Sequence, residues 1–466
     1  QSIPKLLIET EYLMDWQEGQ QTFNGTASQI YLLDDTYSKL QTAFAELNQK
    51  AYDNLKTIYD ENLEFAREWV KDSGTHLEEE FELIPMRNDA DIVSLQGSEY
   101  TYLGGAHPST YVSGYNWNPQ TGEEYALQDV TEEYDALYAL LLEELERYYD
   151  SESFFEGYQD TVKEMFYAKN REEGQLQWMM NSQELMLYFN SYEIAPYASG
   201  PVTVTISFAE HPEFIKEKFL KAAKDDVLYL GSNGTVNWDL NGDGSKDSIT
   251  FSSMEDDMNY QLITLQVNDK ELSKKLDGYS AKAYLLCGQN GSNYLYVELG
   301  TDNDYRYLEV FDLNGEEPSL IGETELGSFY DLYPTSSRDF LLASHMDVLG
   351  TYYVYRSFTL GEDGMPQLVD GVYRLYGYQT GKYDHVLTAK RDIPAWKENA
   401  DGSEERTVLP AGSHFHLRET DGESYVKGIL DDGESYRISI EKSSEWGHNI
   451  EGVFEEECFD GIMYAG

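Results

Sequence analysis

Hydrophobic and polar positions divide the chain into two parts with different periodicities. In the first part, extended runs such as Ile3–Met14 and Phe23–Leu33 alternate with stretches whose apolar residues recur every three or four positions. The longest such stretch follows Asp35 and Thr36, which offer a helix N-cap, and it ends near Gly74. Its apolar positions predict one long amphipathic helix: Leu40, Phe44, Leu47, Ala51, Leu55, Ile58 and Trp69.

The same mixture of strands and helices continues to about residue 224. Alternating and β-branched runs predict further strands, and leucines and aromatics at helical spacing predict further helices. Strands with long helices inserted between them predict an α+β domain over residues 1–224, built on an antiparallel sheet. Its remaining predicted strands are Leu77–Ile84, Ile92–Leu103, Tyr111–Trp117, Leu185–Phe189 and Val202–Phe208, and its remaining helices are Leu137–Leu145, Phe154–Lys169 and His211–Ala223.

Two loops in this domain carry candidate binding residues. The segment Gly104-Gly105-Ala106-His107 separates two extended runs, and its paired glycines reach backbone angles that other residues avoid. Exposed backbone beside a histidine suits a ligand, whereas the simpler interpretation is a turn that needs two glycines. The second loop is aromatic and runs from Ser191 to Gly200 with the sequence SYEIAPYASG.

Residues 225–384 have a different pattern, in which short β-rich runs alternate with Gly, Asp and Asn turns. Tyr294–Leu299 and Tyr305–Phe311 predict a hairpin like those of propeller blades. The region is too short for a complete propeller, so blade-like stacked hairpins and an open β-sandwich are both compatible with it. We expect this all-β region to form a domain of its own.

One turn in this region has the spacing of a calcium loop. Oxygen-bearing side chains occupy alternate positions, with a glycine after the third, as a wrapped site for a hard cation requires. No glutamate follows at the twelfth position, so the pattern resembles the loops of propeller blades and dockerins rather than an EF-hand. An acidic turn without metal is the alternative. The predicted Ca²⁺ ligands are Asp239, Asn241, Asp243, Ser245 and Asp247.

Residues 385–466 predict a separate small β domain with evenly spaced short strands. The segment from Ala411 to Ile438 is similar to bacterial SH3-like wall-binding barrels. His414 and His416 share one face of a predicted strand, but the sequence offers no third metal ligand beside them, so ordinary surface or core histidines are the simpler interpretation.

The charge restricts the class of partner. The chain has 33 Lys and Arg against 86 Asp and Glu, a formal net charge of −53. Nucleic acid and anionic membrane surfaces are therefore poor partners, because binding phosphates requires Lys and Arg. A cationic protein, a cationic polymer or Ca²⁺ is favoured, and acidity for solubility alone is the alternative. The 39 tyrosines suit half-exposed sheets and binding faces.

Targeting and redox signals are sparse. The sequence has no run of 18 apolar residues, so no membrane-spanning segment is predicted. It begins as a chain trimmed of its leader would, without a basic segment or a signal-peptide core. Cys287 and Cys458 lie outside any CxxC motif, which leaves a disulfide and two buried thiols as alternatives.

Catalytic motifs are absent from the sequence. It contains no G-x-S-x-G, H-E-x-x-H or P-loop pattern. A carboxylate-pair glycosidase stays open, because 86 acidic residues create many pairs by chance. We therefore expect a non-catalytic protein, with a cell-wall glycan hydrolase or a deacetylase-related enzyme as the alternative, and a purely structural surface protein as a third possibility.

Two motifs carry a family resemblance over about residues 1–220. The GGAH loop with YNWNPQTGEEYALQDV, and LYFNSYEIAPYASG with VTVTISF, resemble the paired extracellular modules of RsiV-type anti-sigma factors. The same pair precedes the catalytic domain of PdaC-type peptidoglycan deacetylases. By position, the resemblance falls on Gly104, Gly105, Ala106 and His107 in one loop, and on Tyr188, Phe189, Tyr192, Pro196, Tyr197 and Gly200 in and beside the other.

This resemblance implies a secreted or lipid-anchored protein of the Gram-positive cell envelope that binds lysozyme, a similar cationic protein, or peptidoglycan. It implies recognition alone, because the chain has no transmembrane helix, no sigma-binding segment and no deacetylase domain. The ligand-binding residues expected from it are Gly104, Gly105, His107, Tyr188, Tyr192, Pro196 and Tyr197.

Overall fold

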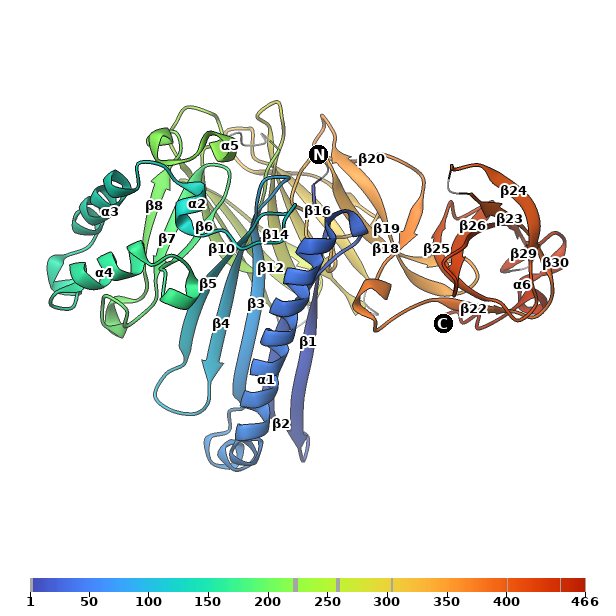
Figure 1. Ribbon diagram of the computed structural model, residues 1–466, viewed down its shortest axis with the longest axis horizontal. Helices are drawn as coiled ribbons and strands as arrows, with labels where there is room; N and C mark the ends of the chain where they lie inside the picture. The colour runs from blue at the N-terminus through green and yellow to red at the C-terminus, as the bar shows by residue number, and fades with distance from the viewer. Residues whose placement is uncertain are drawn as a thin grey trace. The chain divides into compact units, whose positions relative to one another are not determined.

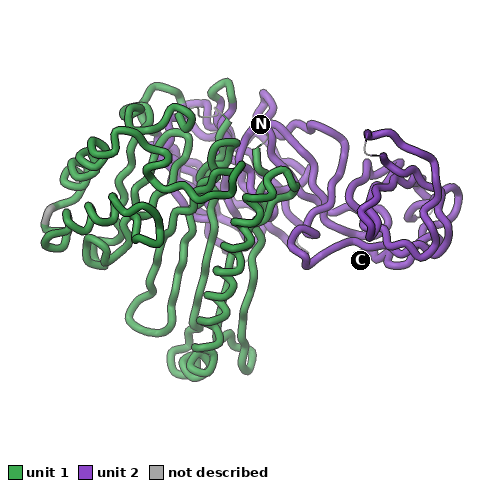
Figure 2. Tube along the Cα trace, in the orientation of Figure 1, with its two compact units in different colours: residues 1–229, 241–246, 289–291 green, residues 230–240, 247–288, 292–466 purple. Residues whose placement is uncertain are grey.

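The computed structural model describes residues 3–220, 225–256, 260–302, 305–399, 401–444 and 446–465. The chain forms two compact units, which Figure 2 shows in different colours. The first unit comprises residues 1–229, 241–246 and 289–291, and the second comprises residues 230–240, 247–288 and 292–466.

The first unit is built on a five-stranded sheet in the order β1-β2-β3-β4-β5. Its pairs are antiparallel except β2–β3, which is parallel. A parallel neighbour requires a crossover, and the long helix α1 provides it. The strands are β1 (Leu6–Gln17), β2 (Gln20–Leu32), β3 (Leu77–Asn88), β4 (Val93–Tyr102) and β5 (Ser109–Trp117), and α1 is Ser38–Ser73.

Helix α1 ends at the predicted Gly74, whereas its start is not capped by Asp35 or Thr36 as predicted, because these residues lie in a 3₁₀ turn ahead of it. Asp34 accepts a hydrogen bond from Thr36 N at 2.8 Å ahead of the short 3₁₀ turn η1 (Asp35–Tyr37), which leads into α1. At the other end Gly74 is left-handed, with φ +74°, and its N–H bonds to Val70 O. Figure 1 shows α1 in front of β1, β2 and β3, with β4 and β5 beside it. Its buried face includes Leu40, Phe44, Leu47, Leu55, Ala66 and Val70.

A second layer of the first unit consists of a small antiparallel sheet and two helices around one apolar core. The sheet is β6 (Gln177–Met180), β7 (Glu184–Phe189) and β8 (Val202–Ser207), and the helices are α3 (Tyr134–Tyr148) and α4 (Tyr158–Tyr167). Two single-turn helices flank them, α2 (Leu127–Val130) and α5 (Glu217–Leu220), together with the 3₁₀ turns η2 (Ser151–Ser153), η3 (Arg171–Glu173), η4 (Tyr197–Ser199) and η5 (Pro212–Phe214).

The second unit is nearly all β, and it begins with two antiparallel meanders. The first meander is β10 (Asn233–Trp238), β11 (Asp247–Glu255), β12 (Tyr260–Val267) and β13 (Lys270–Asp277). The second contains β14 (Ser280–Cys287), β15 (Asn293–Gly300), β16 (Arg306–Asp312) and β17 (Ser319–Thr324). Strand β9 (Val227–Gly231) lies where the chain passes from the first unit to the second.

A larger sheet with its own core follows in the second unit. Its main path, β18-β19-β21-β25-β26-β27-β23-β24, includes strands from both sides of residue 385. The strands are β18 (Phe340–Asp347), β19 (Thr351–Leu360), β20 (Pro366–Leu368), β21 (Tyr373–Leu375), β22 (Val386–Ala389), β23 (Ile393–Glu398), β24 (Glu404–Leu409), β25 (His414–Thr420), β26 (Tyr425–Leu430), β27 (Ser435–Ser439) and β31 (Phe459–Asp460). The short strands β28 (Glu441–Lys442), β29 (His448–Ile450) and β30 (Val453–Phe454), the 3₁₀ turn η7 (Tyr378–Thr380) and helix α6 (Glu455–Cys458) complete the unit.

The predicted fold class is confirmed: a mixed α+β N-terminal part is followed by a half that is nearly all β. The expected SH3-like barrel is not found, because the pairings among the described strands leave the sheet open. The free side of β25 pairs with β22 and with β21, and β21 continues to β19, so the strands extend a larger sheet instead of closing on themselves.

Two local expectations differ from the structure. Strand β6 was not predicted, since its four residues are all buried and show no alternation. In place of one helix over His211–Ala223, the described residues form the 3₁₀ turn η5 and then α5, and residues 221–224 lie outside the described part of the chain. Among the residues that the structure describes, no helix has the length and apolar character needed to cross a bilayer.

One acid of the main sheet is deeply buried. Glu79 on β3 is 1% exposed, and neither of its carboxylate oxygens has a hydrogen-bond partner among the described residues. Burial raises the pKa of Glu79 from 4.5 to about 7; Thr101, opposite it on β4, acts against this shift, and the charge of Glu99 adds to it.

This acid makes stability depend on pH. Because the pKa of Glu79 is about 7 in the folded protein and 4.5 ordinarily, the folded state binds more protons between these values. The free energy of unfolding therefore falls as pH rises through this range. Glu79→Gln is expected to be more stable than the wild type above pH 7, by on the order of 3 kcal/mol, with no difference near pH 4. Urea unfolding across this pH range measures the effect.

Glu78→Gln is the matched control, because Glu78 is the preceding residue of β3 and its side chain is half-buried and bonded to Asn24. This control should keep the wild-type pH profile. A Glu79→Gln variant with the wild-type profile would mean that Glu79 ionises equally in the folded and unfolded states.

Candidate functional site

The structure brings the two predicted loops into contact. The His107 ring stacks on the Tyr197 ring, with centroids 4.1 Å apart and an interplanar angle of 20°. Tyr197 Oη donates a hydrogen bond to Pro108 O at 3.1 Å, and Tyr192 lies 5.8 Å from Tyr197 in a stacked arrangement. We call His107, Tyr192 and Tyr197 the aromatic loop cluster. All three side chains are exposed.

Each loop has a local reason for its shape. Gly104 and Gly105 have φ of +80° and +140°, so both need the backbone freedom of glycine. A side chain at Gly104 would lie 3.3 Å from Phe65 at the C-terminal part of α1, so this loop packs closely against the helix. In the second loop Tyr192 has a φ of +72°, which is unusual for a residue with a side chain.

The outward edge of β5 holds the two loops together. Asn190, at the end of β7, accepts a hydrogen bond from Val112 N at 2.7 Å and donates one to Val112 O at 3.0 Å, as a paired strand would. Further along, Gly114 N bonds to Gln177 Oε1 and Gly114 O accepts from Arg171 Nη2. Side chains from the second layer thus satisfy an edge that is otherwise open.

The remaining predicted ligand residues lie in different surroundings. Tyr188 and Pro196 are half-buried, and burial raises the pKa of Tyr188. Gly200 ends the second loop with a φ of +71°. Phe189 is fully buried in the core beneath the loops, so the likeness by position does not place it at a surface site.

A sheet face that the sequence analysis missed is open beside these loops. Asp15 faces α1, where it pairs with Arg67 at 2.7 Å, so the alternate residues of β1 face the other way. Among them Tyr12 and Trp16 are 61% and 60% exposed. Strand register places two rows of side chains across this face: Met14, Asn24, Glu78 and Tyr102 in one, and Tyr12, Thr26, Glu80, Tyr100 and Thr110 in the other. We call these two rows and Trp16 the outer sheet face.

The outer sheet face combines aromatic and acidic groups. Glu78 and Glu80 lie at its centre on β3, with aromatic or apolar side chains toward β1 and β4. Adjacent strands are about 4.8 Å apart, so each row spans roughly 15–20 Å. The face is therefore broad and flat, unlike an enclosed small-molecule site.

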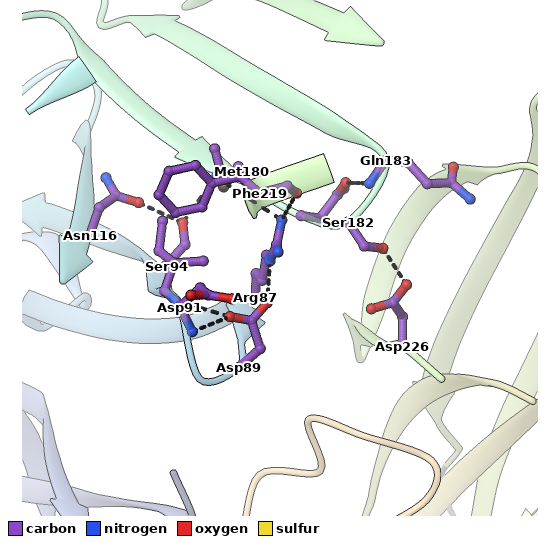
Figure 3. A network of polar contacts seen from close by, with 12 residues as sticks. Arg87, Asp89, Asp91, Ser94, Asn116, Met180, Ser182, Gln183, Phe219 and Asp226 are labelled. Atoms are coloured by element: carbon purple, nitrogen blue, oxygen red, sulfur yellow. Dashed lines mark hydrogen bonds and ion pairs between the residues drawn. The ribbon is translucent and has the colours of Figure 1, made fainter. Parts of the chain in front are cut away.

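A buried polar network connects the main sheet to the second layer (Figure 3). The Arg87 side chain is 4% exposed, and it pairs with Asp89 at 2.6 Å and donates to Phe219 O at 2.8 Å. Ser182 bonds to Asp226, whose pKa burial raises to about 7. These groups bond to one another and to backbone, which fits a structural role.

The predicted calcium loop is shaped by its own side chains. Asp243 Oδ1 accepts from Ser245 N at 2.7 Å, and Asn241 Oδ1 accepts from Asp243 N at 2.9 Å. Asp247 accepts from Leu240 N and from Asn268. Within the described ranges, no three His, Cys, Asp or Glu side chains gather as a metal site would need. The calcium prediction therefore rests on spacing alone.

The histidines, the cysteines and the turn after β16 in the second unit have contacts that fit a structural role. His416 lies between two carboxylates, 2.6 Å from Asp384 and 2.9 Å from Asp431, and Asp431 also contacts His414. Cys287 and Cys458 are both buried and form no disulfide, so of the two alternatives the buried thiols are confirmed. The Phe311–Gly315 segment joins β16 to β17 as a turn, in which Asp312 accepts from Asn314 N.

Comparisons with known proteins give a family of unknown function. Residues 128–209 match the family described as "Protein of unknown function (DUF3298)". A crystal structure of a DUF3298 member from Bacteroides fragilis NCTC 9343 is similar, with 16% identity, 46% of this chain and 95% of that chain covered, and a TM-score of 0.34. One from Pseudomonas aeruginosa PAO1 has 15% identity, coverage of 46% and 98%, and a TM-score of 0.30.

No curated protein matches the chain. The matched segment contains α3, α4, the small sheet and the loop with Tyr192 and Tyr197, but not the GGAH loop. The family description and the titles of these two structures name no RsiV-type or PdaC-type protein, so that resemblance stays a prediction.

Asn190→Ala is expected to separate the two loops. The variant leaves Val112 N and O without partners at a covered edge, which should cost about 1–3 kcal/mol of unfolding free energy. Hydrogen exchange should become faster at the Val112 amide and in the Ser191–Gly200 loop.

Asn181→Ala is the control, because Asn181 is similarly buried and accepts two backbone bonds in the turn between β6 and β7. It should destabilise the fold without changing exchange at Val112. Equal exchange at Val112 in both variants would show that Asn190 does not hold the edge.

Proposed function

We propose that this protein is a non-catalytic binding protein of the cell envelope, secreted or lipid-anchored. Its ligand would be a cationic protein such as lysozyme, with peptidoglycan as the alternative. The observation that supports this proposal most is the stacking of His107 on Tyr197, which joins two distant loops into one exposed cluster. The outer sheet face extends the candidate surface from this cluster toward β1.

The chemistry of the surface fits a basic protein. Tyr and Trp bring large contact areas with few rotatable bonds, and they stack with Arg and Lys side chains. Glu78 and Glu80 supply carboxylates between the aromatic groups. The net charge of −53 would accelerate the approach of a cationic partner, most strongly at low salt.

Binding to lysozyme tests the proposal. Calorimetry should detect a complex with the intact protein that persists at physiological salt. A His107→Ala/Tyr197→Ala variant should bind at least about tenfold more weakly, a loss of about 1.4 kcal/mol, because exposed aromatic anchors dominate such interfaces. Tyr12→Ala/Trp16→Ala should weaken binding in the same direction.

A matched control is His211→Ala/Tyr148→Ala, which removes the same side-chain types from another part of the first unit. Tyr148 is 67% exposed, and His211 contacts Glu213 and Phe214, which are near it in the chain. If binding disappears at physiological salt, or if both double variants weaken it equally, the interaction is general attraction between opposite charges and the proposal fails. Wall fragments would then be the next ligand, and release of sugars from them would contradict the non-catalytic part of the proposal.

We also propose Ca²⁺ as the ligand of the Asp239–Asp247 loop, on the basis of its spacing. Millimolar Ca²⁺ should raise the Tm by a few degrees, because only the folded loop presents the oxygens together. An equal concentration of Mg²⁺ should not raise the Tm. Asp243→Asn should abolish the shift. Asp312→Asn, the same substitution in the turn between β16 and β17, should leave it intact; a shift that survives Asp243→Asn would place the ion elsewhere.

A further inference from the structure

A groove lies beside α1, on the opposite side of the main sheet from the outer sheet face. Its volume is about 720 Å³, within the usual range of small-molecule sites. One wall comes from residues 46–57 of α1, and the other comes from β3, β4 and β5. Figure 1 shows the arrangement of these elements: α1 lies in front of β1–β3, with β4 and β5 beside it.

The aromatic side of the groove is fixed by its neighbours. Phe81 and Tyr115 meet edge to face, with ring centroids 6.4 Å apart. Tyr115 also lies parallel to Trp117, at 5.8 Å and 9°, and the Arg171 guanidinium is 4.5 Å from its ring. These contacts hold the rings in place, so a ligand would not have to order them.

The polar side offers both donors and acceptors. Lys50 carries an ammonium donor, the Asn54 amide both donates and accepts, and Glu46 accepts. None of these three side chains bonds to another residue in the described part of the chain. Glu99, opposite them on β4, adds a half-buried carboxylate.

This combination selects a class of ligand. A sugar ring has an apolar C–H face and a rim of hydroxyls that both donate and accept hydrogen bonds. The aromatic side matches the first feature and the mixed polar side matches the second. Acidic sugars are disfavoured, because Glu46, Asp53 and Glu99 outnumber the one ammonium of Lys50. A purely cationic ligand would use only the acceptors and leave the Lys50 ammonium facing a like charge.

We propose that this groove binds an uncharged oligosaccharide, with its rings against Phe81 and Tyr115 and its hydroxyls bonded to Lys50, Asn54 and the carboxylates. The site is separate from the surface proposed for lysozyme, because the groove lining shares no residue with the aromatic loop cluster or the outer sheet face.

The experiment is calorimetric titration of the intact protein with a β-1,4-linked tetramer of N-acetylglucosamine at physiological salt. The wild type should bind it, and Lys50→Ala/Asn54→Ala should bind at least about tenfold more weakly. Lys56→Ala/Asn62→Ala is the matched control: it makes the same substitutions on the same helix, at positions that do not line the groove. Circular dichroism and Tm confirm that both double variants are folded.

Two results would overturn the proposal. One is no binding of the tetramer at millimolar concentration, and the other is equal weakening in both double variants. Pentalysine serves as a second probe, and binding of pentalysine in place of the tetramer, lost in Lys50→Ala/Asn54→Ala, would assign the groove to cations instead. Lysozyme binding should be unchanged in Lys50→Ala/Asn54→Ala, and tetramer binding should be unchanged in His107→Ala/Tyr197→Ala, so each proposal fails separately.

Discussion

The outward edge of β5 is the constraint on which the first unit depends. An edge strand exposes N–H and C=O groups that must find partners once another layer covers them. Here the partners are side chains. Asn190 forms hydrogen bonds with the backbone N–H and C=O of Val112, and Gln177 and Arg171 bond to the backbone N–H and C=O of Gly114. The layers also approach closely, because a side chain at Gly114 would lie 1.8 Å from Trp178 O. Since the β6–β8 sheet is fixed at this edge, the loop that follows β7 is brought to the loop that precedes β5.

An excess of acid on this scale must be accommodated without enough bases to neutralise it. Many carboxylates do so by accepting backbone N–H groups in their own turns, as Asp89 does from Asp91 and Ile92 and Asp421 from Glu423 and Ser424. These bonds stabilise the carboxylate and the turn together, and they need no cation. In the Asp239–Asp247 segment the same device shapes the loop, so an acidic repeat with glycines specifies a turn whether or not a metal binds.

Local signals were sufficient for much of the fold. Helical spacing from Leu40 to Val70 and a glycine at position 74 define α1, and alternation defines β1–β5, β7 and β8. The paired glycines at 104 and 105 correctly indicated a turn. Contacts between distant segments were beyond such signals. Nothing near Asn190 indicates that it pairs with Val112, and Tyr12, Met14 and Trp16 alternate with Leu13 and Asp15, so the pattern does not say which face meets α1. The prediction of a barrel after residue 385 was wrong for a related reason, because the sequence of a short strand indicates its length but not which strands it pairs with.

The two faces of the main sheet differ because α1 covers only part of one of them. On the α1 side, apolar residues are buried between α1 and strands β1–β3. The part of this face near β4 and β5, beside α1, forms a groove with an aromatic side. On the other side, the β6–β8 layer covers one end of the sheet and leaves the end with Tyr12 and Trp16 exposed. Strand β5 is common to both, since Tyr115 faces the groove while its neighbour Gly114 bonds to Arg171 and Gln177. Arg171 also stacks on Tyr115, so one side chain supports both the groove and the edge that positions the loops.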